Sequence, residues 1–139
     1  MPILSIERQL MRSHRPRSQL AARPDPSAVV TKAALRAADQ LALTNRALAA
    51  VVGLSEATVS RMRAGDYALQ PGQKAFELAL LFVRLARSLD AIVGGDDAIA
   101  GAWLRNTNTA LRDAPLKLIQ TVPGLMNVLQ YLDARRAVV

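Results

Sequence analysis

The chain contains no cysteine and only one histidine among its 139 residues. Without cysteine, neither a disulfide framework nor a thiolate metal site can form. The histidine, His14, lies in an arginine-rich N-terminal stretch, so the usual general base of nucleophilic catalysis is missing. Convergent acids, metal-ligand spacing and a glycine-rich phosphate loop are missing from the sequence as well. We therefore expect no enzyme, no metal site and no other cofactor.

Long apolar runs are absent too. Arg84 and Arg87 interrupt the longest apolar stretch, and no run reaches the roughly 18 uncharged residues of a membrane span. The first residues carry Arg8 and Arg12 among their apolar positions and lack the hydrophobic region of a secretion signal. The sequence therefore predicts a cytoplasmic protein without a membrane partner.

Aromatic residues make up only 4% of the chain, although 51% of it is hydrophobic. Alanine and leucine supply most of the apolar content, and helix-capping residues rather than alternating β-branched residues interrupt it. This composition favours an all-α fold. The length allows one compact domain or two small helical lobes that share a core.

Acidic residues are outnumbered, since 18 Lys and Arg face 11 Asp and Glu, giving a formal net charge of +7 and a pI near 11.0. Residues 1–67 hold ten basic and five acidic residues, whereas residues 68–139 hold eight and six. The excess in the first half indicates a nucleic acid or another acidic partner. A generally basic bacterial protein remains an alternative, because an arginine bias can follow from nucleotide composition alone.

The segment from Thr44 to Gly65, TNRALAAVVGLSEATVSRMRAG, has the spacing of two short helices joined by a glycine turn. Thr44 and Ser55 stand where N-caps belong, and Gly53 and Gly65 stand where a turn and a helix end favour positive φ. Three further positions suit the crossing of the helices and the core: Ala49, Val59 and Met62. The pattern predicts a DNA-binding helix-turn-helix. Any two short helices with a glycine between them share part of this pattern.

The second helix of this motif would present short or basic side chains to DNA. Val59 and Met62 pack inward in this arrangement. The positions left facing outward are Glu56, Ala57, Thr58, Ser60, Arg61 and Arg63. Such side chains suit a major groove. We expect a homodimer to place two of these helices in successive grooves of an operator with a short inverted repeat.

The segment resembles the Xre, or lambda-repressor-like, helix-turn-helix, with RMRAG at residues 61–65 in place of that family's usual end to the recognition helix. The resemblance implies that Asn45 and Arg46 contact phosphates, and that base edges are approached by Glu56, Ala57, Ser60 and Arg61. Glu56 departs from the pattern and leaves the operator sequence open, because a carboxylate accepts from cytosine N4 but repels phosphate. The full set of predicted DNA-binding residues is Asn45, Arg46, Ser55, Glu56, Ala57, Thr58, Ser60, Arg61 and Arg63.

The chain divides into three predicted parts. Residues 1–27 are rich in arginine and proline, which predicts a flexible basic tail that is either solvated or follows DNA phosphates. Residues 28–70 hold the helix-turn-helix region, led by a helix from Ala28 to Leu43. Residues 71–139 form a second helical lobe.

The second lobe opens with a long helix, from Gln73 to about Val93, that is apolar over most of its circumference. Its main apolar stripe follows the helical period: Ala75, Leu78, Ala79, Phe82, Leu85, Ala86, Leu89, Ile92 and Val93. Leu80, Leu81 and Val83 lie outside this stripe, so the helix needs cover on more than one side. A homodimer contact or a partner protein would supply this cover, and so would the chain's own C-terminal helices.

From Trp103 onward, short helices alternate with asparagine and proline punctuation. The Trp103-Leu104 pair, an asparagine turn, Pro115-Leu116, Gly124 and a helix from Val128 to Leu132 resemble the toxin-binding domain of the Xre/MbcA/ParS antitoxins, over about residues 71–136. Two departures occur. Residues 112–114 replace a glycine before the proline, and the chain lacks the family's aromatic and glycine ending, so its toxin contacts can differ.

The resemblance implies a type II antitoxin that covers the active site of a RES-domain toxin, an enzyme that consumes NAD or transfers ADP-ribose, and that represses its own operon. The predicted toxin-binding residues are Trp103, Tyr131, Arg135, Arg136, Val138 and Val139. Trp103 suits either core or interface. Arg135 and Arg136 suit the rim of a dinucleotide cleft, or are simply solvated. A stand-alone phage-type repressor with a C-terminal dimerisation lobe is the alternative.

Overall fold

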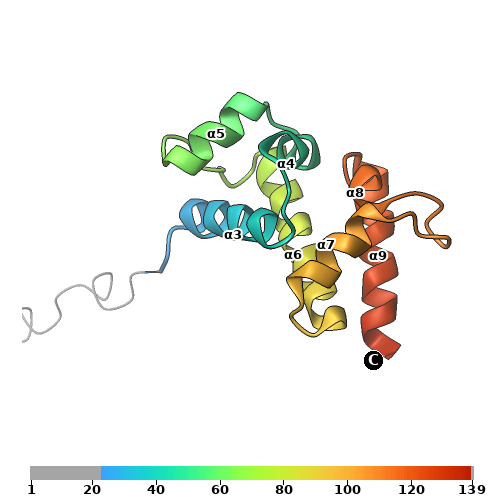
Figure 1. Ribbon diagram of the computed structural model, residues 1–139. Coiled ribbons are helices and arrows are strands. Elements are labelled where there is room, and N and C mark those ends of the chain that lie inside the picture. Colours follow the sequence, from blue (N-terminus) through green and yellow to red (C-terminus); the bar gives the residue numbers. More distant parts are fainter. Residues whose placement is uncertain (1–22, 139) are drawn as a thin grey trace, which may run out of the picture.

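The computed structural model describes residues 23–138, and that part of the chain forms seven helices (Figure 1). They are α3 (Pro26–Gln40), α4 (Asn45–Val52), α5 (Glu56–Ala64), α6 (Lys74–Val93), α7 (Asp97–Arg105), α8 (Pro115–Leu118) and α9 (Val122–Val138). Residues 23–138 contain no strand, and one antiparallel bridge joins Asn108 to Asp113. The predicted all-α fold is confirmed. None of these helices is long and apolar enough to cross a membrane.

Helix α6 is the central element of the molecule (Figure 1). Helices α3 and α4 pack against it from the first half of the chain, and α7 and α9 pack against it from the second half. Phe82 and Leu85 in α6 are fully buried, with 0% exposure. One continuous cluster of buried apolar residues runs from Val30 in α3 to Leu132 in α9. The two halves therefore share a single hydrophobic core.

The apolar circumference of α6 is covered mainly by the chain's own helices, the second of the two possibilities that the sequence left open. Leu81 and Val83, which lie outside the main stripe, are partly buried against the core. Leu80 remains 46% exposed. The need for an outside partner is therefore reduced to a small area around Leu80.

Helix α3 begins and ends earlier than the predicted range of 28–43. The Asp25 carboxylate accepts from the backbone N–H of Ser27 at 3.1 Å, and Pro26 occupies the first turn, where its missing N–H costs nothing. At the other end the chain leaves the helix at Ala42, whose φ is +55°. The N–H of Leu43 then bonds the Ala38 carbonyl at 2.8 Å. The apolar period continued through Leu43 because this residue, although outside the helix, is buried.

The C-terminal half contains a close approach between α8 and α9. Gly124 lies in the first turn of α9, and a Cβ at this position would overlap the carbonyl oxygen of Leu118 at the end of α8. Only glycine fits there without a shift of the backbone. The predicted inward face of the last helix is confirmed, with at most 2% exposure for each of its members: Leu125, Val128, Leu129 and Leu132.

Candidate nucleic-acid and partner-binding surfaces

The helix-turn-helix is formed by α4 and α5, with the predicted residues at its ends. Thr44 Oγ1 accepts from the N–H of Ala47 at 3.0 Å, and Ser55 Oγ accepts from the N–H of Thr58 at 3.1 Å. Gly53 and Gly65 end the two helices at φ of +73° and +82°. Each helix therefore has a capped start and a left-handed end, which fixes its length and the angle of the turn.

Helix α5 packs inward through Val59 and Met62, as predicted, at 0% and 3% exposure. Most of the predicted outward set is exposed, including Glu56, Ala57, Ser60, Arg61 and Arg63. The outward placement of Thr58 is wrong, because this residue is only 8% exposed. Thr58 lies four positions before Met62 and so shares its face of the helix. Its hydroxyl bonds Ser55 Oγ at 2.8 Å, which satisfies it away from solvent.

Arg61 is exposed but is not randomly oriented. Its Nη2 donates to Thr58 Oγ1 at 3.1 Å, and its guanidinium lies 5.9 Å from the centre of the Tyr67 ring. A cation over an aromatic face is held by the negative charge of the ring. Buried Thr58 thus contributes to the surface indirectly, because it orients the arginine that the sequence assigns to base contact.

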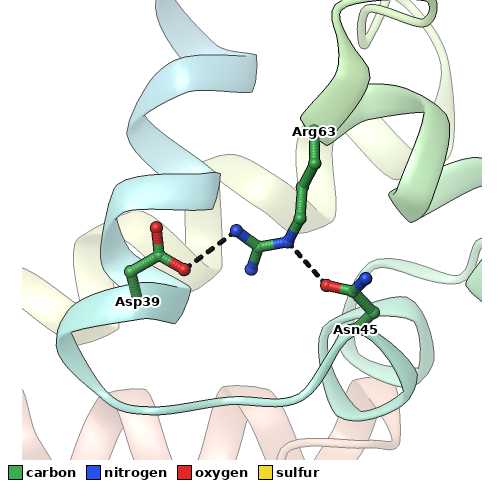
Figure 2. A network of polar contacts seen from close by, with 3 residues as sticks. All are labelled: Asp39, Asn45 and Arg63. Carbon is green, nitrogen blue, oxygen red and sulfur yellow. Dashed lines mark hydrogen bonds and ion pairs between the residues drawn. The ribbon is translucent and has the colours of Figure 1, made fainter.

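Arg63 connects three helices rather than pointing freely outward (Figure 2). Its Nε donates to Asn45 Oδ1 at 2.6 Å, and its Nη1 donates to Asp39 Oδ1 at 2.9 Å. Asp39 lies near the end of α3, Asn45 at the start of α4 and Arg63 in the last turn of α5. Two of the predicted DNA-binding residues, Asn45 and Arg63, are therefore bonded to each other.

Asp39 was missed by the sequence reasoning. It lies 24 residues from Arg63, and no spacing rule connects two residues on helices whose crossing is unknown. Arg46 is exposed on the first turn of α4, next to this network in the chain. Among the described residues it takes part in none of the ion pairs, so its charge faces solvent at the start of the motif.

A second candidate surface lies on α7 and α9. The rings of Trp103 and Tyr131 stack, with centroids 6.2 Å apart and an interplanar angle of 17°. The Arg135 guanidinium lies 5.0 Å from the centre of the Tyr131 ring. Both aromatic residues are half-buried and Arg135 is exposed. Three of the predicted toxin-binding residues therefore form one cluster, which we call the aromatic stack: Trp103, Tyr131 and Arg135.

Arg136 does not belong to the aromatic stack. It lines a groove between α3 and α6 instead, together with Val29, Leu80, Val83, Arg84 and Arg87. A step of one residue turns the helix by about 100°, which separates the two neighbouring arginines onto different faces. The side chain of Val138 and the whole of Val139 lie outside the described residues, as do residues 1–22 of the predicted tail and His14.

Two family models match the chain and together span most of it. The antitoxin Xre-like helix-turn-helix domain matches residues 20–84, and the antitoxin Xre/MbcA/ParS C-terminal toxin-binding domain matches residues 88–137. A search of curated proteins finds no match. The first match contains the capped α4 and α5, and the second contains the aromatic stack and the Gly124 contact. The chain belongs to the Xre/MbcA/ParS family of antitoxins, with a helix-turn-helix for DNA and a helical domain for a toxin.

Proposed function

We propose that this antitoxin neutralises a RES-domain toxin, an enzyme that consumes NAD or transfers ADP-ribose, by covering the entrance to its active site. We further propose that it acts in the cytoplasm, is not itself an enzyme, and represses its own operon from an inverted-repeat operator. The supporting observation is that the recognition helix and the aromatic stack share no residue and lie in different halves of the chain. One molecule can thus hold DNA and a protein at once.

The aromatic stack has the chemistry of a protein contact. Trp, Tyr and Arg are the residue types that most often dominate the binding energy of an interface. Trp103 and Tyr131 supply flat apolar area, and Arg135 supplies a guanidinium that pairs bidentately with a carboxylate. This combination suits the polar rim of a cleft that receives an anionic dinucleotide. Ser60 and Arg61 would supply base preference on the DNA side.

Growth rescue tests the toxin assignment. A RES-type reading frame beside the gene is expressed alone and together with this chain, and growth and cellular NAD are followed. We expect the toxin to arrest growth and this chain to restore it, with a purified complex recovered from the same cells. If the chain neither binds nor protects against its neighbour, the stand-alone repressor replaces the antitoxin assignment.

The separation of the two neighbouring arginines predicts different effects on toxin inhibition. Arg135→Gln removes the cation of the aromatic stack and should weaken toxin binding by about 1 to 2 kcal/mol. Arg136→Gln, the comparison, removes the same charge from the groove, outside the aromatic stack, and should weaken toxin binding less than Arg135→Gln does. Titration of toxin activity with each variant measures both. Equal inhibition by the two variants would contradict a role for the aromatic stack.

The proposed homodimer would use the groove between α3 and α6. Val29 and Leu80 are 49% and 46% exposed and line this groove together, which leaves an apolar area without cover in the single chain. Arg84, Arg87 and Arg136 line it as well. A symmetric contact brings the arginines of both copies near one another, so salt should strengthen the dimer by screening their repulsion.

Leu80→Lys tests this contact. A further cation beside the groove arginines of both copies should convert the protein to a monomer in sedimentation equilibrium, while the single-chain core stays intact because Leu80 does not belong to it. Ile99→Lys is the control, since Ile99 is 54% exposed and lies away from the groove, on α7. A dimer that survives Leu80→Lys lies on another surface.

A further inference from the structure

One arginine of the toxin-binding domain reaches back to the DNA-binding half. Arg105, in the last turn of α7, donates from Nη2 to the Ala42 carbonyl at 2.7 Å. Its Nη1 donates to the Leu41 carbonyl at 3.2 Å and to the Gly101 carbonyl at 2.9 Å. Leu41 and Ala42 belong to the connection between α3 and α4, so a single guanidinium joins the C-terminal half to this connection.

The connection between α3 and α4 has a backbone that needs support. Ala42 adopts φ of +55°, a left-handed conformation in which a Cβ approaches the following carbonyl. Helix α3 also ends here, where its last carbonyl oxygens lack partners within the helix. A guanidinium is a strong donor for such oxygens, because its charge shortens and strengthens the hydrogen bonds. Arg105 therefore stabilises a backbone geometry that alanine does not favour by itself.

Gly101 leaves the space that this arrangement requires. A Cβ at position 101 would lie 3.3 Å from Arg105 Nη1 and 3.9 Å from the Leu41 carbonyl oxygen. The first distance is tighter than ordinary contact, so a side chain there would shift the guanidinium by a few tenths of an ångström relative to its acceptors. The missing side chain of Gly101 and the long side chain of Arg105 thus both allow the contact between α7 and the α3–α4 connection.

The same connection is held from its other side by the recognition helix. Asp39 and Asn45 flank it, and both accept from Arg63 of α5 (Figure 2). Arg105 fixes the backbone between the two acceptors, and the acceptors fix Arg63. The contacts therefore follow one another in space from α7 to the connection and from the connection to α5.

We propose that Arg105 is a positioning residue for DNA binding. By holding the α3–α4 connection it keeps Asp39 and Asn45 in place for Arg63, and through Arg63 it sets the orientation of the recognition helix against α3 and α4. Arg105 itself need not touch DNA. This role goes beyond toxin neutralisation and autoregulation, and it does not depend on the identity of the toxin.

A double-mutant cycle on the full-length chain tests the proposal. The DNA probe is a duplex selected by the wild-type protein from a random library, so that the test does not assume repression of its own operon. Arg105→Ala and Arg63→Ala should each weaken binding of this duplex about tenfold by fluorescence anisotropy. The double variant should bind no more weakly than Arg63→Ala alone, because residues that act through one network are not additive.

Matched controls separate this role from loss of charge. Arg112→Ala removes the same charge from an exposed site between α7 and α8 and should reduce affinity for the selected duplex by less than twofold. Binding to a scrambled duplex should fall equally in Arg105→Ala and Arg112→Ala. The proposal is overturned if Arg105→Ala resembles Arg112→Ala on the selected duplex, or if the losses of Arg105→Ala and Arg63→Ala multiply.

Gly101→Ala keeps the test decisive even if Arg105→Ala fails to fold. Alanine is a better helix former than glycine, so α7 should be as stable as before or more stable. Its Cβ would nevertheless displace Arg105 Nη1. We expect about threefold weaker binding of the selected duplex, an unfolding temperature that does not fall, and a shifted Arg63 Nε–H resonance. Wild-type affinity and an unshifted resonance in Gly101→Ala would overturn the proposal.

Discussion

The recognition helix α5 and the final helix α9 are held in place by opposite means. Helix α5 buries only Thr58, Val59 and Met62, and its ends are fixed by a serine cap, a left-handed glycine and the bonds of Arg63. Helix α9 lies against α6 through a row of leucine and valine side chains and against α8 through Gly124. Helix α5 should therefore respond to changes of polar groups, and helix α9 to changes of side-chain volume.

The largest expected effect tests the volume side of this contrast. Gly124→Ala places a Cβ where the Leu118 carbonyl already lies, so α8 and α9 must separate. We expect a loss of about 3 kcal/mol in the free energy of unfolding, measured by chemical denaturation. Toxin binding should also weaken, because α8 and α9 belong to the toxin-binding domain. Gly101→Ala is the matched control, because its Cβ meets mainly the movable end of Arg105 and should not lower the free energy of unfolding. Equal stability of the two variants would contradict the conclusion that close packing holds α9 in place.

A smaller effect tests whether polar groups control the function of α5. Arg61 is oriented by Thr58 and Tyr67 on the exposed face of α5, so Arg61→Ala should weaken operator binding by about 1 to 3 kcal/mol and relax one operator position. Stability should hardly change, since Arg61 contributes nothing to the core. Arg46→Ala is the comparison, expected to weaken all duplexes alike and to reduce the salt dependence. An equal loss on random DNA would mean that Arg61 contacts phosphate only.

The smallest expected effect comes from an exposed ion pair, and it shows how little a solvent-screened polar contact contributes to stability. Lys117 and Asp113 form an ion pair at 3.7 Å with side chains 77% and 40% exposed. Lys117→Gln should change the free energy of unfolding by less than about 0.5 kcal/mol, because solvent screens such pairs. Asp133→Asn should cost more, since Asp133 binds both Arg84 and the buried Ser88 hydroxyl. Thermal unfolding of both variants gives the comparison, and a Lys117→Gln loss as large as that of Asp133→Asn would contradict it.

The parts of the fold governed by neighbours in sequence could be predicted. Thr44 and Ser55 cap because a side-chain oxygen reaches an N–H three residues on, and Gly53 tolerates positive φ wherever it occurs. The stripe of α6 and the inward face of α9 followed from the helical period. These rules need no knowledge of how the helices cross.

The parts that depend on the crossing of helices could not be predicted. Arg63 meets Asp39, and Arg105 meets Ala42, across 24 and 63 residues of chain. The stack of Trp103 on Tyr131 likewise joins two helices far apart in sequence. The burial of Thr58 follows from the helical period, because its i+4 neighbour Met62 lies on the same inward face of α5.

Helix α6 has a consequence for exchanging parts between antitoxins. The two family matches meet between residues 84 and 88, inside this 20-residue helix and not in a loop. A chimera joined there inherits one helix that packs on α3 and α4 from one parent and on α7 and α9 from the other. Insertion or deletion of a single residue at the junction would rotate Leu85 and Leu89 by about 100° relative to Phe82. An exchange that joins a new toxin-binding domain to an existing DNA-binding domain must therefore keep the number of residues in α6, so that its apolar side chains stay on the same faces.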